Sequence, residues 1–510
     1  MSLIQRLHHW SQTCPDHIAL QRGGQGLTFQ AWAALSHRWA ADLQRRGLKR
    51  GDRVLLMVGL SVELYGILAA LWQVGAVVVA LSPQVGRAAL GRACEALQPQ
   101  AWIAPRLLLW GLPRFVPALG RIPQRLTLGD LGRNPVDGGI GGEEPDPDGI
   151  ALITFTSGST GEAKLIERSH RQLQAQGEAL APILQSQPGS RELGILPLFG
   201  LAHLGAGGRL VLPDFPVQPL PKIPGRRLFE LIQSANIQRL VASPTVFTRL
   251  VQAAQGQTLS HLEQIFIGGA PVGLKLLAHL QALAPQAEIA IVYGATEAEP
   301  IAQQVDAEMT VRENDRCAIA ARPHHGQGLL VGPPISAITL KIITPRSPNP
   351  ESPEAFAQIT VSPGEPGEIC VTGPHILTIP HSPHQFTLKG QRWHRTGDLG
   401  YQDPQGRLWL LGRVVGLIED ERGLLYPWAV EAVANDWPGV VRSAVVSQRG
   451  QRVLYVQWLW GYQPQDYAGL KMQLAWAQLD RIAPMAKIPV ERRHGAKVDY
   501  PRLFKCLGIP

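Results

Sequence analysis

Cysteine and charged residues are scarce in this sequence, and each scarcity argues against a class of protein. Only 5 of its 510 residues are cysteine, and no two of them form a C-x-x-C pair. This argues against a disulfide framework and against a zinc site built on cysteine. Charged residues make up only 17% of the chain, which excludes coiled coils and disordered proteins because both are rich in charge.

Basic charge is present but is nowhere concentrated. The formal net charge is +8, yet no run of lysine and arginine exceeds two residues, and aromatic residues do not alternate with basic ones. A nucleic-acid partner is therefore not expected. A nucleotide or an acidic carrier protein fits the charge better.

The chain also lacks a convincing targeting or membrane segment. Its first residues contain no apolar run suited to a signal peptide, and we expect a cytoplasmic protein. The stretch 54–81 is long enough to span a bilayer and is charged only at Glu63. It divides naturally into a strand (54–60), a helix capped by Ser61 and a second strand (76–81), so we predict a βαβ unit.

The remaining pattern is that of a large α/β enzyme. In the first 300 or so residues, apolar runs alternate with helical stretches, which predicts largely parallel sheets flanked by helices. From Gly328 the runs become shorter and alternate, as in an antiparallel β unit, and after Arg413 the pattern is mixed α and β. We predict an α/β fold with a domain over 1–413, made of two parallel-rich sheets and a small β unit, and a small α+β domain over 414–510. The acidic Gly/Pro tract 133–148 is predicted to be a surface connector.

The segment LITFTSGSTGEAK leads an apolar strand into a loop that suits phosphate. Its glycines allow close approach of the backbone, its hydroxyl groups and backbone N–H groups are donors, and its lysine is a cation. An ordinary Ser/Gly surface loop is the alternative. It is not a Walker A loop, because the G-K-[ST] sequence is missing, and this argues against a P-loop phosphotransferase. The candidate residues are Thr156, Ser157, Gly158, Ser159, Thr160, Gly161 and Lys164.

Three later segments supply what else a nucleotide needs. In IAIVYGATEAEP, Tyr293 can stack on a base, Thr296 can contact a phosphate, and Glu297 is a hard oxygen ligand for Mg²⁺. In WHRTGDL, Asp398 can accept both ribose hydroxyls, with Arg413 beside it. The alternatives are a plain strand-end turn for the first segment, and a turn-capping Asp398 with a surface Arg413 for the second.

The third segment is HGAKVDYPRL, in which Lys497 follows a Gly-Ala turn. Taken alone, this pattern is also typical of an ordinary lysine exposed to solvent.

In order and spacing, TSGSTGEAK, YGATE, RTGDLG, Gly412-Arg413 and HGAKVDYPRL closely resemble the acyl-adenylate-forming ligases. This family includes acyl-CoA synthetases, peptide-synthetase adenylation domains and luciferases, and the resemblance covers nearly the whole chain. It implies two steps. A carboxylate attacks the α-phosphate of MgATP and displaces pyrophosphate, and an acceptor then attacks the acyl-adenylate and releases AMP. It also implies that the C-terminal domain is mobile.

The resemblance implies a role for each matching residue. The loop from Ser157 to Lys164 would hold the β- and γ-phosphates, and Lys497 would bridge the carboxylate and the α-phosphate as the catalytic lysine. Thr296 and Glu297 would complete the catalytic set, with Glu297 as the magnesium ligand. The adenine would be framed by Gly269, Ala270, Pro271, Tyr293 and Gly294, and the ribose held by Asp398 and Arg413.

The sequence departs from the family pattern at a few positions. Ala163 and Leu165 stand where proline and glycine are usual, and Val415 with Gly416 stands at the hinge. YGATEAEP, GLLYPWAVEAVAN and RRHGAK resemble the β-lactone synthetases of olefin biosynthesis and related fatty acyl-CoA ligases more than amino-acid-activating domains. In the lactone-forming relatives the acceptor is the substrate's own β-hydroxyl.

Several questions stay open at this stage. We expect an AMP-forming acid-CoA ligase that passes the acyl group to the thiol of CoA or of an acyl carrier protein. A β-lactone synthetase, in which the substrate's own β-hydroxyl is the acceptor, is the alternative, and a non-catalytic nucleotide-binding protein is the alternative from another class. The acyl chain, fatty or β-hydroxy fatty, should be selected by residues 198–208, 243–250 and 268–294, which are mostly small or apolar. Within the first of these, His203 either gates the pocket or is an ordinary loop histidine.

Overall fold

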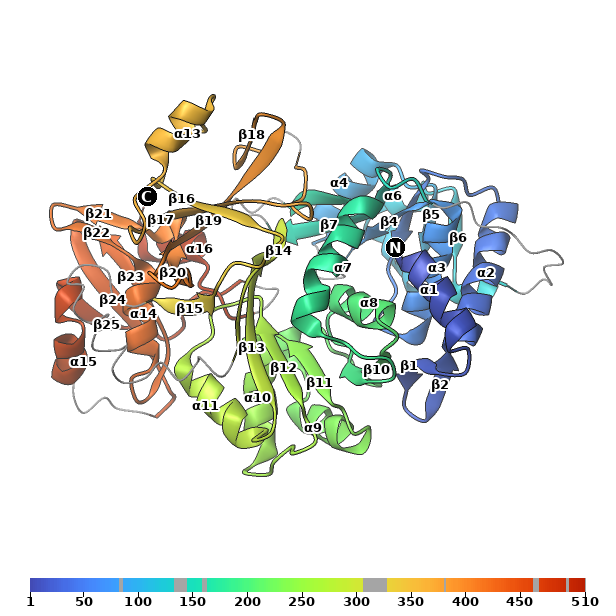
Figure 1. Ribbon diagram of the computed structural model, residues 1–510, viewed down its shortest axis with the longest axis horizontal. Helices are drawn as coiled ribbons and strands as arrows, with labels where there is room; N and C mark the ends of the chain where they lie inside the picture. Colours follow the sequence, from blue (N-terminus) through green and yellow to red (C-terminus); the bar gives the residue numbers. More distant parts are fainter. Residues whose placement is uncertain are drawn as a thin grey trace. The chain divides into compact units, whose positions relative to one another are not determined.

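A computed structural model describes residues 1–81, 86–132, 145–157, 163–305, 328–379, 382–461, 467–491 and 495–509 (Figure 1). The chain forms two compact units. Unit 1 consists of Met1–Val217, Leu231–Val241 and Leu377–Pro380, and unit 2 of Gln218–Glu230, Ala242–Ile376 and His381–Pro510. No helix in these described ranges has the length and apolar character needed to cross a bilayer.

The first sheet of unit 1 confirms the predicted βαβ unit. Strands β3 (Arg53–Leu56) and β4 (Val77–Ala80) are parallel neighbours, joined by helix α3 (Val62–Val74). The helix begins where expected, because Ser61 Oγ accepts the N–H of Leu64. The sheet order is β6 (Gln124–Leu126), β5 (Ala101–Ile103), β3, β4, β7 (Ile150–Ser157) and β8 (Ala163–Ser169).

Both faces of this sheet are buried at its centre, which explains why the central strands β4 and β5 are apolar throughout. Val54 and Leu56 pack into one core cluster, while Leu55 and Met57 pack into another. The helices in these clusters and around them are α1 (Leu3–Thr13), α2 (Phe29–Arg45), α3, α4 (Arg87–Leu97), α5 (Arg106–Gly111) and α6 (Pro117–Gly120). The short 3₁₀ helix η1 (Leu112–Arg114) lies between α5 and α6, and a second one, η2 (Leu128–Asp130), follows β6.

A second group of strands completes unit 1. Strand β9 (Arg191–Leu193) is parallel to β10 (Arg209–Leu212) and β11 (Arg239–Ala242), and β10 is parallel to β1 (Ile18–Arg22). Strand β2 (Gln25–Thr28) pairs with β1 in the antiparallel sense. Helices α7 (His170–Leu184) and α8 (Pro197–Gly205) flank them.

The first part of unit 2 is an α/β region with two parallel strands and a third strand that returns beside them. Strands β12 (Gln264–Gly268) and β13 (Glu288–Ala295) are parallel, and β14 (Ala298–Val305) returns beside β13 as a hairpin. The helices here are α10 (Pro244–Ala254) and α11 (Leu274–Leu283). Helix α9 (Gly225–Ser234) and turn η3 (Leu220–Lys222) precede them in the chain.

The antiparallel sheet predicted after Gly328 is confirmed. Its order is β15 (Leu329–Gly332), β20 (Leu408–Arg413), β19 (Gln391–Gln402), β17 (Gly367–Thr372) and β16 (Thr339–Ile343), with β18 (Gln385–Leu388) also on β19. Helix α13 (Pro353–Ile359) lies between β16 and β17 in the chain.

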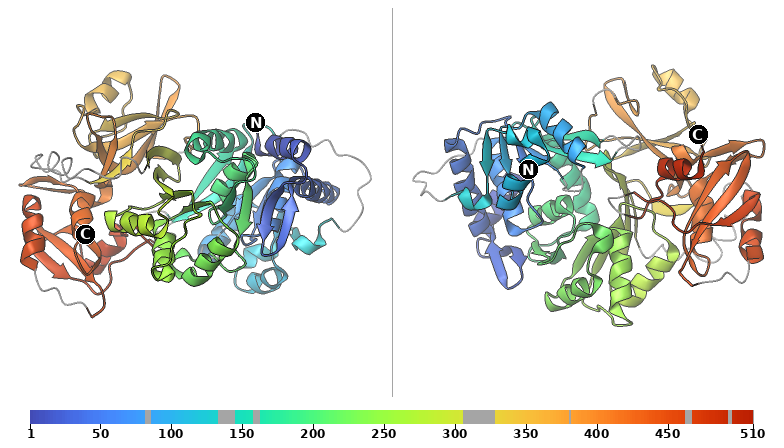
Figure 2. Two further views of the ribbon diagram at one scale, coloured as in Figure 1. Left: turned by 60° about the horizontal axis from the view of Figure 1, so that its bottom comes forward. Right: turned by 180° about the vertical axis from the view of Figure 1, so that it is seen from behind.

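The last part of unit 2 builds cores of its own. Strands β23 (Val440–Gln448), β24 (Gln451–Trp458) and β25 (Arg481–Pro484) form one sheet, and β21 (Ile418–Asp420) and β22 (Gly423–Leu425) form a hairpin. Figure 2 shows these orange-to-red strands gathered with the last helices. The helical elements are η5 (Val414–Gly416), α14 (Pro427–Asn435), α15 (Tyr467–Gln473), η6 (Ala475–Ala477) and α16 (Tyr500–Leu507).

The predicted boundary at residue 413 stays a prediction. One core cluster joins Leu399 and Trp409, before the boundary, to Leu417 and Tyr426 beyond it. At the predicted hinge, Gly416 has a packing reason of its own, because a Cβ there would lie 3.0 Å from the Tyr500 ring.

The buried carboxyl of Glu431 is the main polar feature of this last part. It is 4% exposed, accepts the N–H of Val445 and is hydrogen-bonded by the Tyr500 hydroxyl. Burial raises the pKa of Glu431 to about 7, although its hydrogen bonds and the charge of Arg442 oppose that rise. The folded state therefore favours the protonated carboxyl.

This raised pKa predicts a pH-dependent stability. Because the pKa is raised on folding, the stabilisation is complete below the unfolded value and is lost as pH rises through about 7. Replacing Glu431→Gln keeps the shape without the ionisation. We expect the free energy of unfolding of the variant, relative to the parent, to increase by roughly 2 kcal/mol from about pH 5 to about pH 8.

Urea unfolding at the two pH values measures this difference. The exposed Glu421 offers a control, because Glu421→Gln should leave the pH dependence unchanged. Parallel pH profiles for the parent and Glu431→Gln would contradict a buried titrating carboxyl.

Candidate active site

The predicted adenine-framing residues lie at the carboxyl ends of two neighbouring parallel strands. Gly269, Ala270 and Pro271 follow β12, while Tyr293 and Gly294 are among the last three residues of β13. Gly269 has φ of +79°, a conformation that favours glycine. In open α/β sheets, ligands bind at this edge of the strands.

The predicted ribose-binding pair lies on adjacent strands. Asp398 on β19 is opposite Arg413 on β20, and Arg413 Nε lies 3.1 Å from Asp398 Oδ1. Gly397 allows this pair to form, because its φ is +70° and a Cβ there would lie 3.2 Å from Arg413 Nη2. The Asp398 N–H donates to Thr396 Oγ1 at 3.0 Å. The proximity of Asp398 and Arg413 is thus as predicted, while their contact with a nucleotide stays a prediction.

Tyr293 joins this pair through a contact that the sequence did not predict. Its hydroxyl donates to Asp398 Oδ2 at 2.9 Å, and the whole side chain is 7% exposed. Burial raises the pKa of Tyr293 well above its usual value, and the Asp398 charge adds to the rise. The tyrosine therefore stays protonated and fixes the carboxylate.

The other carboxylate oxygen of Asp398 remains available to a ligand. Oδ1 is buried and accepts no hydrogen bond from the described residues, although it forms an ion pair with Arg413 Nε at 3.1 Å. A buried carboxylate oxygen without a donor has lost hydration that a ligand hydroxyl can replace. Asp398 is thus chemically suited to accept hydrogen bonds from a diol.

Thr296 and Glu297 form the two-residue turn of the β13–β14 hairpin. Ala295 pairs with Ala298 across this turn, and both turn residues are half-buried. No cluster of three metal-ligating side chains exists among the residues that the structure describes. Mg²⁺ does not need one, because it is commonly held by one or two carboxylates together with substrate phosphates and water. Glu297 fits that mode of binding.

His394 is a residue of this site that the sequence analysis did not single out. It is 4% exposed, and burial lowers its pKa to about 4. The charges of Glu297 and Asp398 oppose that shift, whereas His384 and Arg413 reinforce it. Its Nδ1 is buried and has no hydrogen-bond partner among the described residues. His394 is therefore a neutral imidazole in the same electrostatic environment as Glu297 and Asp398.

Lys497 lies on a segment held by backbone contacts. Its carbonyl accepts the N–H of Glu491 at 3.0 Å, and Arg442 donates to the carbonyls of Ala496 and Gly495. The predicted Gly-Ala turn is present, with Gly495 at φ of +65°. Lys497 is half-buried and has no acidic partner in the described ranges, so its charge is available to an anion.

One cavity in unit 2 brings together predicted residues from distant segments. It is lined by the Gly269–Val272 turn, Tyr293, Gly294, Asp398 and Lys497, with β15 and Trp428 completing the wall. A second cavity, of about 350 Å³, also has Lys497 in its wall, along with Pro244, Pro271 and Leu277. Lys497 therefore borders both hollows.

The predicted phosphate loop belongs to unit 1. Strands β7 and β8 form a hairpin in which Thr156 pairs with Lys164 and Ser157 with Ala163. The tip, Gly158 to Glu162, lies outside the described residues. The hairpin was not predicted, because the short apolar run after Lys164 gave no sign of a returning strand. Contact between this loop and a phosphate stays a prediction, as does the connector role of 133–148, most of which is also outside the described ranges.

His203 is neither a gate nor a loop residue. It lies on α8 with 0% exposure, its Nδ1 is 2.9 Å from Ser186 Oγ and its Nε2 is 3.0 Å from the Ser190 carbonyl. Gly208 makes room for the ring, since a Cβ there would come within 2.2 Å of it. Burial and Arg239 lower the pKa of His203 to about 4. The gating interpretation is therefore wrong, and the histidine ties α8 to the connection between α7 and β9.

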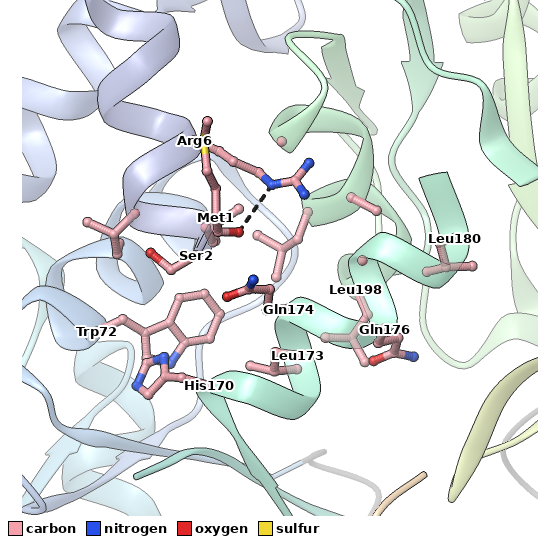
Figure 3. Close-up of a pocket in the computed structure, with 16 residues that line it drawn as sticks. Met1, Ser2, Arg6, Trp72, His170, Leu173, Gln174, Gln176, Leu180 and Leu198 are labelled. Atoms are coloured by element: carbon pink, nitrogen blue, oxygen red, sulfur yellow. Dashed lines mark hydrogen bonds between the residues drawn. The ribbon is translucent and has the colours of Figure 1, made fainter. Parts of the chain in front are cut away.

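Other residues of the predicted 198–208 stretch line a cavity. Leu198, Leu201 and Gly205 line an apolar cavity of about 70 Å³ in unit 1 (Figure 3). Trp72 and His170 form another part of its wall, with ring centroids 6.3 Å apart in an edge contact. Part of the stretch thus lines a cavity whose described wall residues all belong to unit 1. Its role in selecting the acyl chain stays a prediction.

Comparison with known proteins establishes the class. Residues 7–378 match the family described as AMP-binding enzyme. The chain belongs to this family, and it is an ATP-dependent enzyme that forms acyl-adenylates.

Two similar proteins are named olefin β-lactone synthetase. The chain is 31% identical to the one from Xanthomonas campestris pv. campestris, with 96% of this chain and 94% of the relative covered. It is 32% identical to the one from Stenotrophomonas maltophilia, with 98% and 97% covered. A 4-coumarate-CoA ligase from Narcissus pseudonarcissus is 25% identical over 87% of this chain and 80% of its own length.

Solved structures agree on the fold. ATP-bound MatB from Rhodopseudomonas palustris matches with a TM-score of 0.79 and 22% identity, covering 99% of each chain. The predicted α/β fold class is thereby confirmed.

Proposed function

We propose that this protein activates a β-hydroxy fatty acid as its acyl-adenylate and closes it to a β-lactone. The proposal that an acyl-adenylate forms rests on one cavity, which is lined by the Gly269–Val272 turn, Tyr293, Asp398 and Lys497. Its strand-end turn suits an adenine, its buried carboxylate suits a ribose diol, and its lysine suits a phosphate or a carboxylate. A nucleotide with a carboxylic acid beside it uses all three.

In the first step, a carboxylate oxygen forms a bond to the α-phosphorus, and the bond from that phosphorus to the leaving pyrophosphate breaks. Lys497 carries the positive charge that attracts both anions and offsets the charge growing between them. Thr296 contacts the α-phosphate, and the loop from Ser157 to Lys164 holds the β- and γ-phosphates. Glu297, together with the phosphates, would hold Mg²⁺, which would supply further charge neutralisation.

In the second step, the substrate's own β-hydroxyl oxygen forms a bond to the acyl carbon. The bond from that carbon to the adenylate oxygen breaks, AMP leaves, and the hydroxyl proton passes to solvent. Support for this acceptor comes from the two β-lactone synthetases, which match nearly the whole chain at 31% and 32% identity.

A thiol is the second candidate acceptor. Its support is the identity of 25% with a 4-coumarate-CoA ligase and of 26% with a putative acyl-CoA ligase from Bacillus subtilis. In that case the thiol sulfur of CoA, or of an acyl carrier protein, attacks the acyl carbon in place of the β-hydroxyl. We place either reaction in the cytoplasm, where scattered unpaired cysteines are common.

Mass spectrometry of the products from ATP and a β-hydroxy fatty acid, with and without CoA, separates these candidates. We expect AMP, pyrophosphate and a product lighter than the acid by one water, whether or not CoA is present. The same acid without its β-hydroxyl is the matched control and should give no such product. A thioester formed only with CoA would assign the second candidate. Release of neither AMP nor pyrophosphate with a broad panel of acids would favour a non-catalytic nucleotide-binding protein.

A further inference from the structure

Unit 1 carries three large apolar side chains on its surface within a short segment. Leu107 is 83% exposed, Trp110 is 72% exposed and Phe115 is 58% exposed. Large apolar residues are often partly exposed, but a group of three this close in sequence is unusual in a monomeric protein surface. We call Leu107, Trp110 and Phe115 the apolar tip.

The segment that presents the apolar tip is firmly anchored. Leu109, Val116 and Leu119 alternate with the tip residues in sequence and are buried in the core shared with α4. The tip side chains are therefore held outward by the packing of their neighbours.

Arginines flank the apolar tip in the sequence. Arg106, Arg114, Arg121 and Arg125 are all exposed, and within the described residues none has an acidic partner. The sequence from 96 to 129 contains no aspartate or glutamate. The fifth arginine, Arg87 of α4, lies with its guanidinium carbon 4.3 Å from the centre of the Phe115 ring.

This combination identifies the chemistry of the partner. Trp, Leu and Phe side chains enter the boundary between lipid headgroups and acyl chains, and arginines beside them pair with anionic headgroups. A protein partner would present acidic residues at fixed points, whereas the exposed Arg106, Arg114, Arg121 and Arg125 have no acidic partner among the described residues. A phosphate-rich apolar surface matches both features at once.

We propose that the apolar tip and its arginines dock unit 1 onto an anionic lipid surface. Trp110 and Leu107 enter the interface, and Arg106 and Arg114 contact lipid phosphates. The docking does not depend on the catalytic activity proposed above, because no residue of the candidate active site takes part in it.

Flotation with lipid vesicles tests the proposal on the full chain. The probes are vesicles of phosphatidylcholine alone and of phosphatidylcholine mixed with phosphatidylglycerol. We expect binding to the mixed vesicles that weakens between about 0.1 M and about 0.5 M salt, because the Debye length shortens. Each arginine near an anionic surface contributes about fivefold to the partition coefficient, so Arg106→Ala with Arg114→Ala should lower it roughly 20-fold.

The variant Leu107→Gln with Trp110→Gln should lower the partition coefficient by roughly tenfold or more, because it removes the inserted apolar groups. Both residues are exposed, so folding should be unaffected, and unchanged thermal unfolding verifies this. Trp460, which is 99% exposed in unit 2, is the matched control. Trp460→Gln should bind vesicles as the parent does.

Two results would overturn the proposal. One is a failure of the parent to float with phosphatidylglycerol vesicles at low salt, and the other is flotation that the tip and arginine variants do not change. Self-association of the parent that is lost in the Leu107→Gln, Trp110→Gln variant, without vesicle binding, would assign the tip to a protein interface instead.

Discussion

Replacing Lys497→Ala is expected to lower the rate of acyl-adenylate formation by about 100-fold to 1,000-fold, the usual effect of removing one group that stabilises transition-state charge. Lys497 lines the cavity that also contains Asp398 and Tyr293, and it has no acidic partner among the described residues. Without its ammonium group, two anions must approach each other unaided. Acid-dependent exchange of labelled pyrophosphate into ATP measures this step alone.

The control for this variant is Lys471→Ala, which removes an exposed lysine from the last turn of α15. It should leave the exchange rate as it is. The backbone carbonyls of the Lys497 segment accept hydrogen bonds from the Glu491 N–H and from the Arg442 side chain. Truncating the Lys497 side chain should therefore not unfold the segment. Unchanged exchange in Lys497→Ala would return this residue to an ordinary solvated lysine.

Replacing Asp398→Asn is expected to raise the KM for ATP by roughly 10-fold to 100-fold, since hydrogen bonds to a charged group contribute about 1.5–3 kcal/mol each. The amide oxygen can still accept from Tyr293, so the local shape is kept. What is lost is the charge that faces Arg413 and the strong acceptor offered to a ribose hydroxyl. Initial rates over a range of ATP concentrations give the KM.

The same hairpin offers a matched control for the turn-cap interpretation. Asp403 is a true turn cap, because its Oδ1 accepts the N–H groups of Gln405 and Arg407. Asp403→Asn should leave the KM for ATP unchanged. A normal KM in Asp398→Asn would mean that Asp398 also serves the turn and not a nucleotide.

Much of the fold could be predicted because its strands are buried on both faces. Continuous apolar runs such as 54–56 and 77–80 are typical of parallel strands, and Ser61 marks the helix between them. The returning edge strands β2, β8 and β14 were not predicted. They are polar or mixed along their length, and only their hydrogen bonding to a neighbour defines them.

The sequence predicted which residues belong to the site but not how they contact one another. Motifs named Tyr293 and Asp398, but a sequence cannot show that two residues so far apart share a hydrogen bond. His394 was missed for a related reason. A register shift near Gly397, whose φ is +70°, interrupts the alternation of strand faces in β19, so periodicity could not place His394 near Glu297.

We expect this chain to split ATP at the α-phosphate in order to activate a carboxylic acid. Separation of the nucleotides formed from ATP labelled at the α-phosphate, with a β-hydroxy fatty acid present, tests it most directly. We predict labelled AMP and an equal amount of pyrophosphate, both dependent on the acid. Labelled ADP with inorganic phosphate, or AMP that forms equally well without the acid, would contradict it.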